Sequence, residues 1–234
     1  GWFQALWKDL RLELEFAYIA GKITDIGTPS QPSTVDNETD DPDAYKLRQW
    51  GIAFEGEYRA LQKKLGAYLR TGFASGDRGT PGRLSYRQDL LSQQSVDGDK
   101  LSNFSFNPNY WVDLILFRRI LGTITGAYYL APGMSYDILR TDFGNVFGGR
   151  FDFIYSRAQF REQTYGKNPN LGSEIDLQIY YRTGDGPSFL DGFYTAFQYG
   201  ILFPLKGMKF PANEPDDPNA GKAWTLRLLM AVQY

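Results

Sequence analysis

Charged side chains recur at every second position in several segments of the chain. This spacing places them on a single face of a β-strand, because successive strand side chains point to opposite faces. The basic members are all arginine, whose planar guanidinium engages a carboxylate through two parallel N–H donors. Opposite charges on neighbouring strands can therefore pair. The predicted charged face comprises Arg11, Glu13, Glu15, Glu55, Glu57, Arg59, Arg70, Asp137, Arg150, Asp152, Glu174, Asp176, Arg182 and Arg227.

Enzymatic chemistry is not expected from this set of residues. The chain contains no histidine and no cysteine, so the usual general base, the commonest metal ligand and thiolate chemistry are all missing. Two other groups of acids, within 36–43 and 214–217, lack the spacing of a calcium-binding loop and are expected to be solvated. A net charge of −2 gives no electrostatic case for nucleic-acid binding. We expect no enzyme, no cofactor, no bound metal and no nucleic-acid partner.

Apolar side chains occupy the alternate positions between these charges. The last eleven residues show the pattern most clearly, because every second side chain from Trp224 to Tyr234 is large and apolar. Seven more segments and the shorter stretch Trp2–Trp7 share it, which predicts nine strands. A lipid-facing Arg or Lys costs roughly 2–4 kcal/mol at the bilayer midplane, so a charge-free face is typical of a membrane-spanning strand. The positions expected to face the membrane include Leu12, Leu14, Phe16, Ile52, Phe54, Phe153, Leu177, Phe197, Leu228 and Tyr234.

The connections between these strands alternate between short and long. Transmembrane barrels have short periplasmic turns and longer extracellular loops, so this alternation favours a barrel over a soluble sandwich. No run of 18 apolar residues is present, so no transmembrane helix is expected. We predict one all-β domain over residues 1–234, an antiparallel up-and-down transmembrane β-barrel. The expected long extracellular loops are 24–45, 77–126, 161–173 and 206–222.

The predicted strand number is odd, whereas bacterial single-chain barrels have an even number. We therefore expect the chain to form the C-terminal portion of a barrel. Either further strands precede Gly1 or a second chain completes the wall.

One segment fits two kinds of element. Large apolar side chains from Trp111 to Ile124 are spaced three to four apart, as on one face of a helix. Tyr110, Val112, Leu114 and Leu116 also alternate as in a strand. A strand here would break the alternation of loop lengths, so we favour a short helix folded into the 77–126 loop.

Part of this segment also carries a family resemblance. The stretch Asn103–Arg119 (NFSFNPNYWVDLILFRR), continued by Ile120–Thr125 and by Glu174–Leu177, resembles a motif of porin-like outer-membrane proteins of deltaproteobacteria, including myxobacteria. These proteins are related in style to alginate-export barrels, and the likeness extends from about Leu10 to Tyr234. It implies a barrel of porin type with more strands upstream. It carries over no substrate and no catalytic residues.

These patterns together predict an outer-membrane porin or channel of a Gram-negative bacterium. The charged face would line a water-filled lumen that passes ions or small polar solutes; eight acids against six arginines hint at a preference for cations. The same charges could instead fill a narrow barrel with salt bridges. The alternative is therefore a structural barrel subunit of an envelope complex for motility, adhesion or secretion, with loops that bind partner proteins. The expected partners are the lipid bilayer, lipopolysaccharide, and either further copies of the chain or other envelope proteins.

Overall fold

The computed structural model describes residues 1–23, 45–78, 100–184, 192–209 and 221–232. Almost all regular structure is β-strand, which confirms the predicted all-β class. The strands are β1 (Trp2–Trp7), β2 (Leu10–Ile23), β3 (Tyr45–Ala60), β4 (Leu65–Ala74), β5 (Lys100–Leu101), β6 (Ala127–Arg140), β7 (Val146–Ala158), β8 (Asn170–Arg182), β9 (Phe193–Pro204) and β10 (Ala223–Val232). Three short helical turns complete the set: η1 (Leu116–Ile120), η2 (Arg161–Gln163) and η3 (Lys206–Met208).

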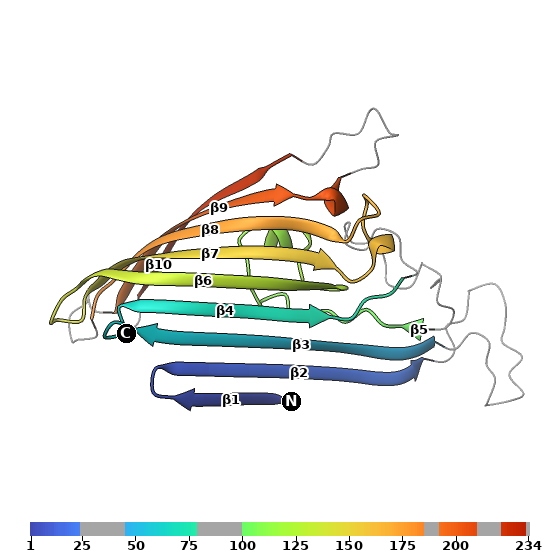
Figure 1. The fold of residues 1–234 in the computed structure, drawn as a ribbon, viewed down its shortest axis with the longest axis horizontal. Helices are drawn as coiled ribbons and strands as arrows, with labels where there is room; N and C mark the ends of the chain where they lie inside the picture. The colour runs from blue at the N-terminus through green and yellow to red at the C-terminus, as the bar shows by residue number, and fades with distance from the viewer. Residues whose placement is uncertain (24–44, 79–99, 185–191, 210–220, 233–234) are drawn as a thin grey trace, which may run out of the picture.

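The strands form one ten-stranded sheet whose long members follow one another in sequence order. Each long strand pairs antiparallel with the next, while the two-residue β5 adds a parallel pair beside β3. The predicted antiparallel order and the nine predicted strands are thereby confirmed. Figure 1 shows the sheet curling strongly from β1 toward β10. The sheet is open, because β1 and β10 do not pair with each other within the described residues.

Short turns and long connections lie at opposite ends of the sheet (Figure 1). Two-residue and five-residue turns at Lys8–Asp9 and 141–145 join β1 to β2 and β6 to β7. The long connections run over 24–44, 75–126, 159–169 and 205–222. The third is shorter than the predicted 161–173, because β8 begins at Asn170 and hydrogen-bonds with β7 from there. The acid groups of 36–43 and 214–217 lie outside the described residues.

The helix expected over Trp111–Ile124 is largely absent. Only Leu116–Ile120 is helical, as a single π-helical turn, and the flanking residues are irregular. The helix prediction is therefore right in kind for five residues and wrong for the rest. None of the helices among the described residues is long and apolar enough to cross a membrane.

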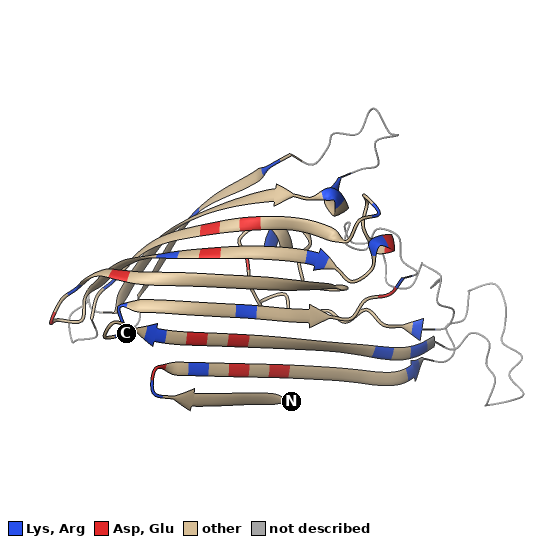
Figure 2. Cartoon of the chain, in the orientation of Figure 1, with Lys and Arg blue, Asp and Glu red and all other residues tan. Residues whose placement is uncertain are grey.

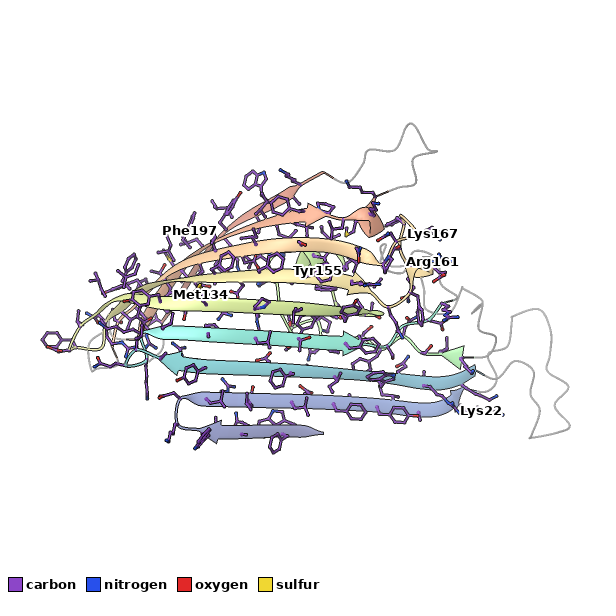
Figure 3. The ribbon with its side chains drawn as sticks, in the orientation of Figure 1. Lys22, Met134, Tyr155, Arg161, Lys167 and Phe197 are labelled. Carbon is purple, nitrogen blue, oxygen red and sulfur yellow. The ribbon has the colours of Figure 1, made fainter. Side chains whose placement is uncertain are left out.

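One face of the sheet is covered by exposed apolar side chains. We call it the outer face. It carries every described residue that the alternation assigned to the membrane, such as Leu177 (45% exposed) and Leu228 (60% exposed); Tyr234 lies outside the described residues. Met134, Tyr155 and Phe197 belong to the same face (Figure 3). Its rows continue from strand to strand in register, as in Met134–Phe151–Leu177–Tyr199–Leu226.

Charge on the outer face is confined to the end from which the long connections leave. By strand alternation and register, the cations of this face are Lys22, Lys46, Arg48 and Arg157. Figure 2 shows Lys and Arg at this end of the sheet, whereas most of the acids lie along the middle of the strands. The outer face thus has an apolar band bounded on one side by basic side chains.

Candidate functional site

The opposite face of the sheet, here called the inner face, carries all of the predicted charged ladder. Strand pairing carries polar side chains across it in register. One row runs Arg59–Gly66–Ser135–Arg150–Gln178–Gln198–Arg227 from β3 to β10. A neighbouring row contains Arg11, Glu57, Tyr68, Asp152 and Asp176. The inner face is therefore a continuous polar surface that includes Tyr, Gln and Ser side chains besides the predicted charges.

Residues 102–126, which we call the docked segment, fold onto this inner face. Figure 1 shows η1 and its flanking coil lying against the sheet on the side away from the viewer. The buried core of the molecule forms at this contact, between the sheet and the segment. The segment contributes Phe106, Val112, Ile115, Leu116, Phe117 and Ile124, and the sheet contributes Ala74, Ala127, Tyr129, Ala131, Ile154, Ala158, Leu171 and Leu202.

Small residues on the inner face make room for the aromatic part of the docked segment. Phe104 and Phe106 lie over Gly51, so that a Cβ added to this glycine would collide with both rings. Phe106 also meets Phe104 and Tyr110 edge to face, with ring centroids 5.7 and 5.6 Å apart. The strand positions beneath the segment must therefore stay small for it to dock.

We expect the Gly51→Val variant to displace the docked segment from β3. Overpacking a filled site typically costs about 1–3 kcal/mol, and here the obstacle is two aromatic rings held by their neighbours. The measurement is the free energy of unfolding in detergent micelles from a denaturant titration. The matched control is Gly21→Val, because a Cβ at Gly21 meets only Leu47 at ordinary contact distance. If both variants lose the same free energy of unfolding, Gly51 does not have the expected role in packing the docked segment.

Carboxylates of β8 hold the irregular part of the docked segment. Glu174, buried to 1% exposure, accepts hydrogen bonds from the backbone N–H groups of Leu114, Ile115 and Leu116 at 3.0, 2.8 and 3.0 Å. Asp176 accepts a further bond from Leu114 N at 3.1 Å. These donors therefore bind side chains of a distant strand in place of carbonyls one turn earlier. That explains why the helix-like spacing of this segment does not give a longer helix.

Asp113, which lies within the docked segment, also accepts hydrogen bonds from backbone N–H groups of the segment. Its carboxylate accepts the backbone N–H groups of Phe117 and Arg118 at 2.8 and 3.1 Å, which caps the first turn of η1. Burial and the nearby charge of Glu174 raise the pKa of Asp113 to about 7. Two carboxyl groups therefore meet the same stretch of backbone, and each is satisfied mainly by amide donors.

A second anchor joins the segment to β3 and β6. The Tyr110 hydroxyl donates to Glu55 at 2.8 Å and lies 2.8 Å from the Tyr129 hydroxyl. Burial, the neighbouring Tyr129 and Glu55 raise the pKa of Tyr110, so its phenol keeps its proton. The segment is thus fixed at Tyr110 as well as at 114–118.

Three of the six predicted inner-face arginines pair within their own strand. Salt bridges join Arg11 to Glu13, Arg59 to Glu57 and Arg150 to Asp152 at 2.8, 2.5 and 2.6 Å. The pairing expected between adjacent strands is not the main pattern, since Arg11 faces Glu57 and Arg70 faces Glu55 but each pairs with another acid. Elsewhere the residue opposite is often like-charged or small. Glu13 faces Glu55, and Arg59 faces Gly66. Arg70 of β4 pairs with Asp152 of β7 at 3.1 Å, although β6 lies between these two strands in the sheet.

The docked segment leaves several hollows against the inner face, and three of them are lined by several residues of the segment. The largest, about 350 Å³, lies between β3 and the Phe104–Tyr110 stretch. A second of about 320 Å³ is lined by charged side chains of β2 and β3 and by Trp111. The third, about 230 Å³, lies on the other side of Trp111 between β4, β7 and η1. Each hollow is open and borders both the segment and the polar wall.

Several predicted residues prove to have different surroundings. Glu174 and Asp176 lie under the docked segment, while Arg11, Glu15 and Arg182 are exposed. Among the described residues no group of three acids, His or Cys is arranged to hold a metal ion. The sequence reasoning missed Asp113, Tyr110 and the glutamines of β8 and β9. Glycine and alanine at inner-face positions beneath the segment were the signal that could have revealed its docking.

No family model, no curated protein and no solved structure matches this chain.

Proposed function

We propose that this protein is an outer-membrane β-barrel channel for ions or small polar solutes. One observation carries the proposal: the same strands present an apolar, exposed outer face and a charged, polar inner face. In water an apolar surface of this extent would be strongly unfavourable, whereas a bilayer accommodates it. The long strands have ten to sixteen residues, and about 9–11 residues suffice to cross the hydrocarbon.

In the proposed barrel both sheet edges are paired. Unpaired backbone groups of β1 and β10 would each cost several kcal/mol in hydrocarbon. The edges therefore pair either with each other or with further strands. The curvature of the sheet toward the docked segment supports a closed wall with that segment inside.

The distribution of charge supports an orientation for the proposed barrel. Long connections of bacterial barrels lie on the extracellular side. The outer-face cations Lys22, Lys46, Arg48 and Arg157 lie at the same end of the strands. In this orientation they would meet the phosphates of lipopolysaccharide, which we propose as the lipid partner.

Conductance through a planar lipid bilayer tests the channel directly. We expect the purified protein to give discrete, steady current steps in potassium chloride, because the hollows beside the docked segment leave a polar path along the wall. A membrane-inserted protein without current would overturn the channel. That result would favour a structural barrel in an envelope complex, sealed by the docked segment.

A further inference from the structure

Two arginines, one within the docked segment and one in the wall of the sheet, make no ion pair among the described residues. Arg118 of η1 and Arg227 of β10 take part in no salt bridge within the described part of the chain. Both lie near the indole of Trp111, with their guanidinium carbons 3.7 and 5.9 Å from the ring centre. Elements far apart in the sequence thus bring two cations to one aromatic side chain.

The hollow of about 230 Å³ beside Trp111 collects further guanidinium groups. Its lining includes Arg70, Arg118 and Arg150, which come from β4, η1 and β7. Arg227 lies close by, since it is opposite Gln198 in register and Gln198 also lines the hollow. Four arginines therefore surround or border one small polar space.

Each acid of this hollow accepts hydrogen bonds from protein donors, although one oxygen of Asp176 has no hydrogen-bond partner among the described residues. Asp152 accepts from Arg150 at 2.6 and 2.9 Å and from Arg70 at 3.1 Å, so one carboxylate serves two guanidinium groups. Asp113 and Asp176 accept backbone N–H groups of the docked segment. With Arg227 included, four arginines meet three carboxylate groups at this hollow, and Arg118 and Arg227 form no salt bridge with any of them.

The electrostatic state of Arg118 agrees with an excess of positive charge. Partial burial and the nearby charges of Arg227 and Arg119 lower its pKa from the ordinary value. A bound anion would relieve that repulsion.

We propose that this hollow binds small organic carboxylates, which makes them the preferred solutes of the channel. The guanidinium fork matches a carboxylate in two-point geometry, and the half-exposed indole of Trp111 offers apolar contact to a short carbon skeleton. A space of about 230 Å³ corresponds to roughly eight water molecules at about 30 Å³ each, which suits a four-carbon dicarboxylate. The inference rests on the proposed channel, because the hollow borders its lumen. A channel that prefers carboxylates selects anions, which is the opposite of the cation preference suggested by the simple count of acids.

Thermal unfolding in detergent micelles tests this binding without relying on conduction. A ligand that binds only the folded state raises the unfolding temperature, and the rise grows with the ratio of ligand concentration to Kd. We expect sodium succinate to raise it above the value in sodium chloride of equal ionic strength. The rise should disappear in Arg118→Gln/Arg227→Gln and persist in Arg11→Gln, a lumen arginine of β2 outside the hollow.

Several outcomes would overturn the inference. They are no succinate-specific rise in the unmodified protein, an equal rise in the double variant, or a larger rise with inorganic phosphate than with succinate. Should the double variant fail to fold, Arg227→Gln alone replaces it, because Arg227 lies in the wall and makes no hydrogen bond to the docked segment among the described contacts. Current without the succinate effect would leave the channel standing and remove the carboxylate site. A succinate-specific rise without current would leave the carboxylate site standing and remove the channel.

Discussion

The Glu174→Ala variant is expected to release the docked segment while keeping the sheet. Three hydrogen bonds to the Glu174 carboxylate would be lost: the N–H groups of Ile115 and Leu116 would have no acceptor, and that of Leu114 would keep only Asp176. Hydrogen bonds to a charged group contribute about 1.5–3 kcal/mol each, so losing three costs about 4 kcal/mol or more. A loss of 4 kcal/mol shifts the docking equilibrium by roughly a thousandfold. Trypsin digestion in micelles measures this, because undocking exposes the Arg118–Arg119 site to cleavage.

Two further variants define the control for this release. Glu174→Gln keeps one carbonyl oxygen as acceptor and should cleave at an intermediate rate. Glu15→Ala removes an exposed inner-face carboxylate of β2 and should leave the cleavage rate unchanged. If Glu174→Ala resists trypsin as well as the unmodified protein does, the carboxylate does not hold the segment.

The strands themselves were predictable because their signal is local. From Trp224 to Val232 every second side chain is large and apolar, and the structure has β10 over Ala223–Val232. A period of two requires no knowledge of the partner strand. The order of strands also followed from local features, since turns such as Lys8–Asp9 and 141–145 force consecutive strands to pair.

The docked segment was not predictable, because its backbone partners are distant in sequence. The donors at Leu114 and Ile115 bind Glu174, about sixty positions later in the chain. Helical spacing describes only side chains and cannot reveal that the amides have better acceptors elsewhere. Tertiary contacts therefore overrode the local preference.

Charged residues could be assigned to a face but not to their partners. Alternation placed Arg70, Arg150 and Asp152 on one face, yet their three-way contact reaches across β6, which has the small residues Ala131 and Gly133 opposite Arg70 and Asp152. The arginines of the proposed carboxylate site are likewise brought together by tertiary structure. Arg118 and Arg227 are 109 positions apart in the sequence (227 minus 118) and meet at Trp111 only because the segment folds inward.

Placing an arginine in the middle of the outer face should distinguish a membrane-embedded sheet from one in water. Leu177 is 45% exposed and lies in an apolar row that extends from Met134 to Leu226. In a bilayer, Leu177→Arg should lower the free energy of folding into lipid vesicles by about 2–4 kcal/mol. On a water-facing surface the same change should stay within about 0.5 kcal/mol. Denaturant titration of the vesicle-inserted protein gives the value.

An arginine placed near the end of a strand is the control for Leu177→Arg. Ala20 is exposed on the same face but lies two residues from Lys22, at the end bounded by cations. Ala20→Arg should cost only about 0–1 kcal/mol, because the penalty for charge falls toward the bilayer surface. Leu177→Ala separates the lost apolar contact from the added charge. Leu177→Arg should lower the free energy of folding far more than Ala20→Arg or Leu177→Ala only if the outer face is buried in hydrocarbon. Equal small effects for all three variants would refute the membrane placement, and with it the channel.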